Sequence, residues 1–199
     1  MTDRSSWTAT THDWRTDLDI EHLAEVRERL GEADAAGGRR HLILEVLAYA
    51  DEEAESQDRT GTAIVTVSPD GRVTVSDDGR GTDTRRDSRG RVVRKPVMAT
   101  ADLRFRDEST APLLPDGLPR RGMSTVAALS SELVHENHRG DGSWSQTSRY
   151  GIPDQELRSI EGRENSGTSV SFLAEIAGSA DLTEADLLAF PSLRVEVRR

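Results

Sequence analysis

The spacing of apolar residues changes from helical to strand-like after residue 60. Apolar positions recur three and four residues apart over 18–30 and again over 40–56, which predicts two helices that each bury one face. Over 62–76 they alternate on either side of Pro69-Asp70-Gly71, which predicts a β-hairpin. The expected buried stripes are Ile20, Leu23, Val26 and Leu30 on the first helix, and Leu42, Val46, Leu47, Ala50 and Ala54 on the second.

The rest of the chain predicts a mixture of short helices and strands. Thr183 and Asp186 form a capping-box pattern at the start of a helix over 184–190. The other expected elements are a loop over 82–95, a short helix over 96–106, a flexible proline-containing segment over 107–121, a helix over 123–134, strands over 132–137, 143–149, 168–173 and 193–197, and a turn over 150–153. This order predicts an α+β fold, a two-layer sandwich with helices on one face of a mostly antiparallel sheet.

Composition narrows the class of protein. The 199 residues suffice for one sizeable domain, expected over 16–199, with a flexible arm over 1–15 that carries Trp7 and Trp14. The absence of cysteine excludes disulfides and thiolate metal sites. A net charge of −10 argues against a DNA-binding surface, and no apolar run approaches the ~20 residues of a membrane helix. We therefore expect a soluble cytoplasmic protein that contacts neither DNA nor a membrane directly.

Two acidic residues stand where chemistry is expected. Asp77 ends the second strand of the hairpin and is followed by Gly79 and Gly81. A carboxylate there can accept a hydrogen bond from an exocyclic amine, and the glycines let a flat or phosphate-bearing ligand approach the backbone. Glu45 lies on a mostly apolar stretch of the second helix. The plain alternatives are a hairpin exit loop for the first residue and a solvated helix position for the second.

Six segments, taken together and in order, carry a family resemblance. They are 22–29 (similar to GLEAVRKR), 41–46 (HHLVYEV), 77–81 (DDGRG, identical), 124–130 (SVVNALS), 150–153 (HGVP) and 167–172 (GTxVxF). They resemble the N-terminal ATP-binding domain found in the B subunits of DNA gyrase and topoisomerase IV, members of the GHKL ATPase group. The resemblance covers roughly residues 22–199 and implies the GHKL (Bergerat) ATPase fold, with ATP as the ligand.

The resemblance implies a role for each matching position. Glu45 would be the general base that activates the attacking water. Asp77 would take the adenine amino group, Gly81 would leave room for the base, and Thr168 would help to bind the adenine end. The full set of nucleotide-binding residues implied is Asp77, Gly79, Gly81, Thr168, Gly117, Arg120, Arg121 and Gly122.

The chain departs from the family at the phosphate and metal end. Tyr49 stands where the family has an Asn that binds Mg²⁺, and a phenol is a poor ligand for that ion, so we expect no metal ligand there. The family's glycine-rich lid GLHGVG becomes 117–122, in which Pro119 removes a backbone donor. Arg120 and Arg121 either contact phosphate as charged donors or are ordinary solvated loop residues. The family's Ile-Pro after DDGRG is replaced by 82–83, Thr-Asp.

Taken together, these features predict an adenine-nucleotide-binding protein similar to the ATPase domain of the gyrase B subunit, with weak or absent hydrolysis. The sequence shows no counterpart of the family's transducer, metal-binding or DNA-binding parts. One alternative is a non-catalytic protein-interaction module on the same fold, with a partner that the sequence does not identify. Another is the ATPase subunit of a type II topoisomerase, an isomerase, completed by other chains.

Overall fold

A computed structural model describes residues 18–30, 37–82, 85–86, 92–93, 98–140, 142–154 and 157–199 of this chain. The arm predicted over 1–15 lies outside the described residues, as do most of the connection after the first helix and most of the loop predicted over 82–95. The described ranges include the strands of the main sheet, the helices on it and the whole segment over 98–122.

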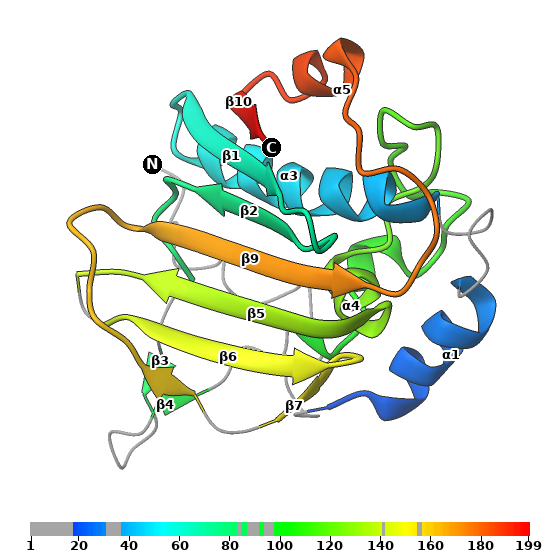
Figure 1. The fold of residues 1–199 in the computed structure, drawn as a ribbon, viewed down its shortest axis with the longest axis horizontal. Coiled ribbons are helices and arrows are strands. Elements are labelled where there is room, and N and C mark those ends of the chain that lie inside the picture. Colours follow the sequence, from blue (N-terminus) through cyan, green and yellow to red (C-terminus); the bar gives the residue numbers. More distant parts are fainter. Residues whose placement is uncertain are drawn as a thin grey trace.

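The described strands form an eight-stranded sheet in the order β10-β1-β2-β9-β5-β6-β7, with β8 paired to β6 (Figure 1). Only β1 and β10 run parallel among these neighbours, and the other pairs are antiparallel. The strands are β1 (Gly61–Val67), β2 (Val73–Asp77), β5 (Ser130–His138), β6 (Trp144–Arg149), β7 (Ile152–Pro153), β8 (Arg158–Ser159), β9 (Gly167–Ala174) and β10 (Leu193–Arg198); β3 (Arg85–Arg86) and β4 (Val92–Val93) form a separate pair.

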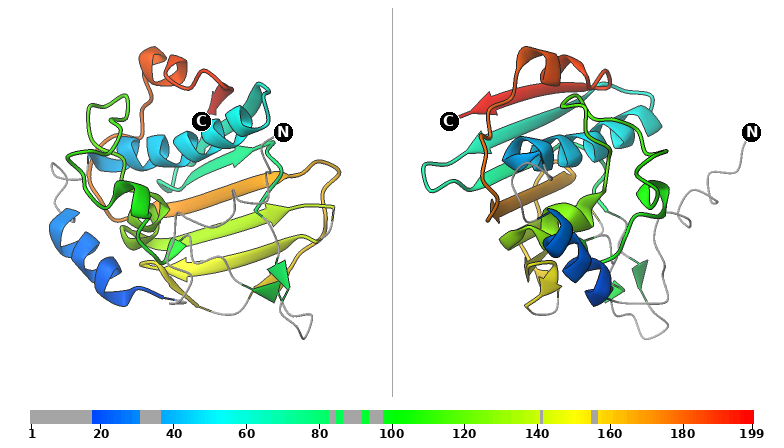
Figure 2. Two further views of the ribbon diagram at one scale, coloured as in Figure 1. Left: turned by 180° about the vertical axis from the view of Figure 1, so that it is seen from behind. Right: turned by 90° about the vertical axis from the view of Figure 1, so that its right-hand side faces the viewer.

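Helices α3 (Gly38–Ser56) and α4 (Met123–Ala128) cover one face of this sheet, and α1 (Ile20–Leu30) lies beside α4 at its edge (Figure 2). Helix α3 packs on β1, β2 and β10, while α4 packs on β5, β6 and β9 and also meets α1. The mostly antiparallel α+β sandwich is therefore confirmed. None of the described helices is long and apolar enough to cross a lipid bilayer.

The core lies between this helical layer and the sheet. The stripe predicted on α3 is buried throughout, and alternate residues of the β1–β2 hairpin point into the same layer. Phe172 of β9 and Leu133 of β5, neighbours in register, extend the core across the middle of the sheet. On α1 the prediction is wrong for Ile20, which is 56% exposed, so the buried stripe begins one turn later at Leu23.

The three helices predicted after residue 95 were all too long. Within the described part of 96–106, the helix is a three-residue 3₁₀ turn, η3 (Leu103–Phe105), capped by the Asp102 side chain. Helix α4 ends at Ala128 rather than continuing to residue 134, because the following residues pair with β9 from Ser130 onward. Long-range strand pairing overrides the helical preference of this stretch. Downstream, α5 (Glu184–Leu188) has the predicted capping box but ends two residues early.

Candidate functional site

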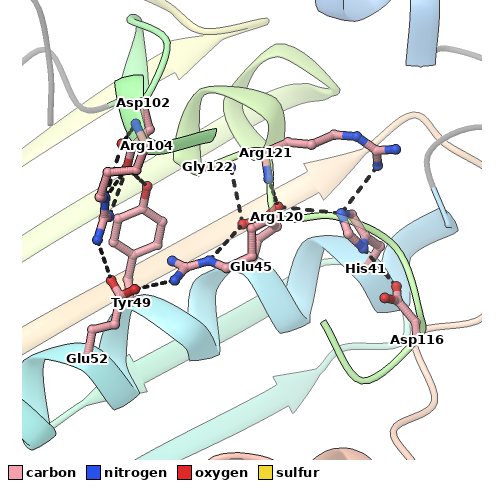
Figure 3. A network of polar contacts seen from close by, with 10 residues as sticks. All are labelled: His41, Glu45, Tyr49, Glu52, Asp102, Arg104, Asp116, Arg120, Arg121 and Gly122. Atoms are coloured by element: carbon pink, nitrogen blue, oxygen red, sulfur yellow. Dashed lines mark hydrogen bonds and ion pairs between the residues drawn. The ribbon is translucent and has the colours of Figure 1, made fainter. Parts of the chain in front are cut away.

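One face of α3 gathers the acidic and aromatic residues that the sequence singled out. His41, Glu45 and Tyr49 lie one turn apart on this face, and Glu52 continues it (Figure 3). All four meet the segment 102–122, which crosses above the helix. Glu45 has no exposed side-chain surface, so a solvated position for this residue is wrong.

The carboxylate of Glu45 is held by the segment that aligns with the family's lid. Its Oε1 accepts a hydrogen bond from the backbone N–H of Arg121, and its Oε2 accepts one from Gly122 at 3.2 Å. His41 Nε2 lies 3.4 Å from Oε1, and Arg120 Nε lies 3.9 Å from Oε2. Both oxygens of the expected general base are therefore already bound by neighbouring donors.

Tyr49 points into the same network rather than toward solvent. Its hydroxyl donates a hydrogen bond to Asp102 Oδ2 at 2.6 Å, and burial, reinforced by that carboxylate, raises the pKa of Tyr49 well above its usual value. The guanidinium carbons of Arg104 and Arg120 lie 5.5 and 4.8 Å from the centre of its ring. Burial acts to raise the pKa of Asp102, but hydrogen bonds from Arg104 and Tyr49 outweigh it and hold that pKa below its usual value.

These contacts do not fit the Mg²⁺ ion that the resemblance implies. The phenol of Tyr49 is protonated and uses its proton on Asp102, whereas Mg²⁺ prefers carboxylate, carbonyl and phosphate oxygens. In the part of the chain that the structure describes, no group of three or more His, Asp or Glu side chains could hold a metal ion. The position that would supply a metal ligand thus serves to fasten α3 to the segment above it.

Arg120 and Arg121 are buried, which excludes the alternative that both are solvated loop residues and leaves contact with phosphate untested. Their exposed fractions are 5% and 9%. Arg120 Nη1 bonds to Glu52, while Arg121 Nε bonds to Glu108 at 3.0 Å. Gly117, at the start of the same stretch, is exposed, and its N–H closes a turn onto the carbonyl of Leu114. The structure therefore brings Arg120, Arg121 and Gly122, but not Gly117, to Glu45.

A buried histidine links the lid segment to the same carboxylate. His41 Nδ1 lies 2.7 Å from Asp116 Oδ2, and its other ring nitrogen faces Glu45. Burial acts to lower the pKa of His41, but the hydrogen bonds to Asp116 and Glu45 together outweigh it and raise that pKa. Sequence reasoning missed these partners; only the spacing of four residues between His41 and Glu45 could have indicated one of the contacts.

The adenine end predicted around Asp77 is assembled across two neighbouring strands. Because Ser76 pairs with Ser169, Asp77 at the end of β2 lies beside Thr168 at the start of β9. Its Oδ1 accepts from the N–H of Gly79 at 2.8 Å and of Thr168 at 3.3 Å, and its Oδ2 accepts from the Thr168 hydroxyl. Burial raises the pKa of Asp77, and these hydrogen bonds only partly oppose the rise.

Gly81 is placed by a residue that the sequence did not single out. The Asn137 side chain accepts from the N–H of Thr82 at 2.5 Å and donates to its carbonyl at 3.2 Å. Gly81 has φ +75°, and an added Cβ would lie 2.7 Å from Asn137 Oδ1 and 2.8 Å from the carbonyl oxygen of His138. The glycine is therefore required by the close approach of β5, and space for a ligand must lie on another side.

Helix α3 connects the two ends of the site. Glu53, two turns beyond Glu45, accepts hydrogen bonds from Arg80 at 2.7 and 3.1 Å. Its Cγ also lies 3.1 Å from the position that a Cβ on Gly79 would take. The same helix thus presents one carboxylate to the lid segment and another to the loop after Asp77.

Comparisons with known proteins find relatives of this chain among DNA gyrase B subunits. The DNA gyrase B subunit of Streptomyces coelicolor is 30% identical over 178 residues, which is 87% of this chain and 25% of the relative. The DNA gyrase B subunit of Mycobacterium tuberculosis is 34% identical over 161 residues, 79% of this chain and 24% of the relative. The chain thus spans about a quarter of the length of the curated relatives it matches. No protein-family model matches.

Among solved structures, the topoisomerase IV ATP-binding domain of Francisella tularensis in complex with a small-molecule inhibitor is similar, with a TM-score of 0.59 and 21% identity. The match covers 79% of this chain and 44% of that one. The resemblance drawn from the six motifs is therefore confirmed: this chain is related in sequence to the B subunit of DNA gyrase and has the GHKL fold of a topoisomerase IV ATP-binding domain.

Proposed function

We propose that this protein, through a domain formed by residues 16–199, binds an adenine nucleotide such as ATP and hydrolyses it weakly or not at all. The observation that carries the proposal is the carboxylate of Asp77, held between β2 and β9. A carboxylate can accept about four hydrogen bonds, and Gly79 and Thr168 use three of these sites. The remaining site, on Oδ2, would accept the exocyclic amine of adenine.

Weak hydrolysis follows from the state of the general base. A base must reach the proton that it removes, directly or through one water. Both oxygens of Glu45 instead accept N–H groups of Arg121 and Gly122, and Tyr49 offers no metal ligand. Turnover therefore requires the lid segment to release Glu45 first, and we expect binding to exceed turnover.

Isothermal titration of the full chain with ATP, ADP and a non-hydrolysable ATP analogue tests the proposal. The Asp77→Ala variant is expected to lose binding of all three ligands. Asp78→Ala is the matched control, because this neighbouring carboxylate is exposed and bonds to Arg59 and the N–H of Thr62. Absence of heat with every ligand in the wild-type protein, or equal binding by the two variants, would contradict the proposal.

A second candidate is a non-catalytic interaction module on the same fold. The observation that favours it is the seating of Arg120 on the ring of Tyr49, at the end of the site where the resemblance places phosphate. In that case the polar network serves stability alone, and neither ATP nor adenosine binds. The titration above therefore separates the two candidates directly, since only the first predicts heat that depends on Asp77.

A further inference from the structure

Arg120 is a buried cation with unused donors. Its side chain is 6% exposed, and Nη1 bonds to Glu52. Its Nε and Nη2 are buried and have no hydrogen-bond partner among the residues that the structure describes. Leaving a buried charged donor unpaired is costly, so such groups in a folded protein call for an explanation, and an anionic ligand is one.

The surroundings fix where these donors lie. The guanidinium carbon is 4.8 Å from the ring centre of Tyr49 and 4.4 Å from that of Phe105, so two rings hold the group in place. The unused Nε lies 3.9 Å from Glu45 Oε2 (Figure 3). The guanidinium is therefore next to both the expected general base and the residue that replaces the family's metal ligand.

Arg104, which lies next to Arg120, is an arginine whose side-chain donors are all used in contacts within the protein. Arg104 lies over the same two rings, at 5.5 Å from that of Tyr49 and 4.8 Å from that of Phe105. Its Nε and both Nη atoms are used, on Asp102 and Glu52. Both arginines thus stack on the rings of Tyr49 and Phe105, but of the two only Arg120 has side-chain donors without a hydrogen bond among the described residues.

We propose that Arg120 takes the place of a divalent cation in this site, so that the phosphate end of a nucleotide is bound without Mg²⁺. The phosphate would accept from Nε and Nη2 of Arg120 and from the backbone N–H groups of Arg121 and Gly122. Those N–H groups now donate to the carboxylate of Glu45, so this carboxylate occupies the place that the phosphate would take. Glu45 must therefore change its side-chain conformation when the phosphate binds. Guanidinium matches phosphate by two parallel hydrogen bonds, which supplies both charge and orientation.

This inference rests on the proposed nucleotide binding and adds that the binding is independent of metal. The tests use the full chain in isothermal titrations with ATP and with adenosine, each in EDTA and in Mg²⁺. Adenosine reports the Asp77 end alone because it has no phosphate. Wild-type protein, Arg120→Ala and Arg120→Lys are compared with Arg104→Ala as the matched control, and thermal melts verify that each variant folds.

The expected result is that wild-type protein binds ATP equally well in EDTA and in Mg²⁺, and more tightly than adenosine. Arg120→Ala weakens ATP by about 10- to 100-fold while leaving adenosine unchanged, because hydrogen bonds to charged groups are lost. Arg120→Lys keeps the charge but not the two-donor fork, so it recovers part of the loss. Arg104→Ala leaves the ratio of ATP to adenosine affinity close to that of the wild type.

Three results would overturn the inference. If ATP binds only with Mg²⁺, Arg120 does not replace the cation. If Arg120→Ala and Arg104→Ala weaken ATP equally, the unused donors have no special role. If neither ATP nor adenosine binds to the wild-type protein, both the proposed function and this inference fail. If adenosine binds and ATP binds only with Mg²⁺, this inference fails but the proposed nucleotide binding remains.

Discussion

Removing one hydroxyl group, by Tyr49→Phe, tests whether the contact between α3 and the segment above it stabilises the fold. The Tyr49 hydroxyl donates to Asp102 at 2.6 Å, and the Asp102 side chain is fully buried. The change leaves the aromatic ring in place, together with the two guanidinium groups over it. Any loss of stability therefore reports the hydrogen bond rather than the packing.

The expected magnitude follows from the partners that remain. A hydrogen bond to a charged group contributes about 1.5–3 kcal/mol. Asp102 keeps its bonds from the Arg104 side chain and N–H, at 2.8 and 3.0 Å, so it is not left unpaired. We therefore expect the lower part of that range, a loss of about 1.5–2 kcal/mol in the free energy of unfolding, or roughly 3–8 °C in Tm.

Urea denaturation at pH 7 measures this loss, and Tyr150→Phe is the matched control. Tyr150 donates to Glu175 at 2.8 Å, but on the surface, so the same chemical change there is expected to cost less than about 0.5 kcal/mol. The pKa of Asp102 is lowered in the folded state, so its contribution is present above the unfolded value and is lost as pH falls through the folded one. The penalty of Tyr49→Phe should accordingly shrink below about pH 4.

Equal losses for Tyr49→Phe and Tyr150→Phe would refute the reasoning, because burial and the charge of the acceptor would then make no difference. A penalty at Tyr49 that grows as the pH falls would also refute it, because protonation of Asp102 removes the charge from the acceptor and can only weaken the hydrogen bond.

Three further outcomes are expected. Gly167→Ala should lower the free energy of unfolding by about 3 kcal/mol or more, because Gly167 has φ +150° and an added Cβ would lie 2.0 Å from the carbonyl oxygen at the end of β2. Gly140→Ala is the control in the same urea assay, because a Cβ there would have no atom of the described residues within 4 Å. Asp116→Asn should lower the pKa of His41 measured by NMR titration, and an unchanged pKa would contradict the contact. Because the pKa of His41 is raised in the folded state, the contact stabilises the fold below about pH 6.5, and this stabilisation is lost as the pH rises through the folded pKa. Thr183→Ala should cost about 1 kcal/mol by removing the cap of α5, and an unchanged urea midpoint would argue against it.

The local elements were largely predictable because their signals are local. The alternation on either side of Pro69–Gly71 predicted β1 and β2, and the spacing of apolar residues predicted α3 with its buried stripe. Where the prediction was wrong, a distant partner decided: α4 stops at Ala128 because the next residues pair with β9, more than 40 positions away. No local preference carries that information.

The two parts of the candidate site, around Asp77 and around Glu45, also differ in how far local sequence predicts them. The alternation of apolar residues before Asp77 predicted that this residue ends a strand beside two glycines. The family resemblance implied that Thr168 belongs to the same site. The polar network on α3 has no such signature, because its partners at Asp102, Arg104 and Asp116 lie in a segment without regular spacing. Sequence therefore indicated that Asp77 and Thr168 belong to one site, whereas it indicated none of the contacts that the segment over 102–122 makes with α3.

Tertiary structure alone decided the environment of each charged group. The sequence predicted that Glu45 stands on a helix face, and the resemblance implied that Tyr49 stands where the family has a metal ligand. It left open whether both residues face solvent. The fold buries them because the segment over 102–122 crosses that face, and burial turns ordinary polar side chains into groups that must be paired. Burial is a property of distant chain segments brought together, so no single stretch of sequence could have specified it.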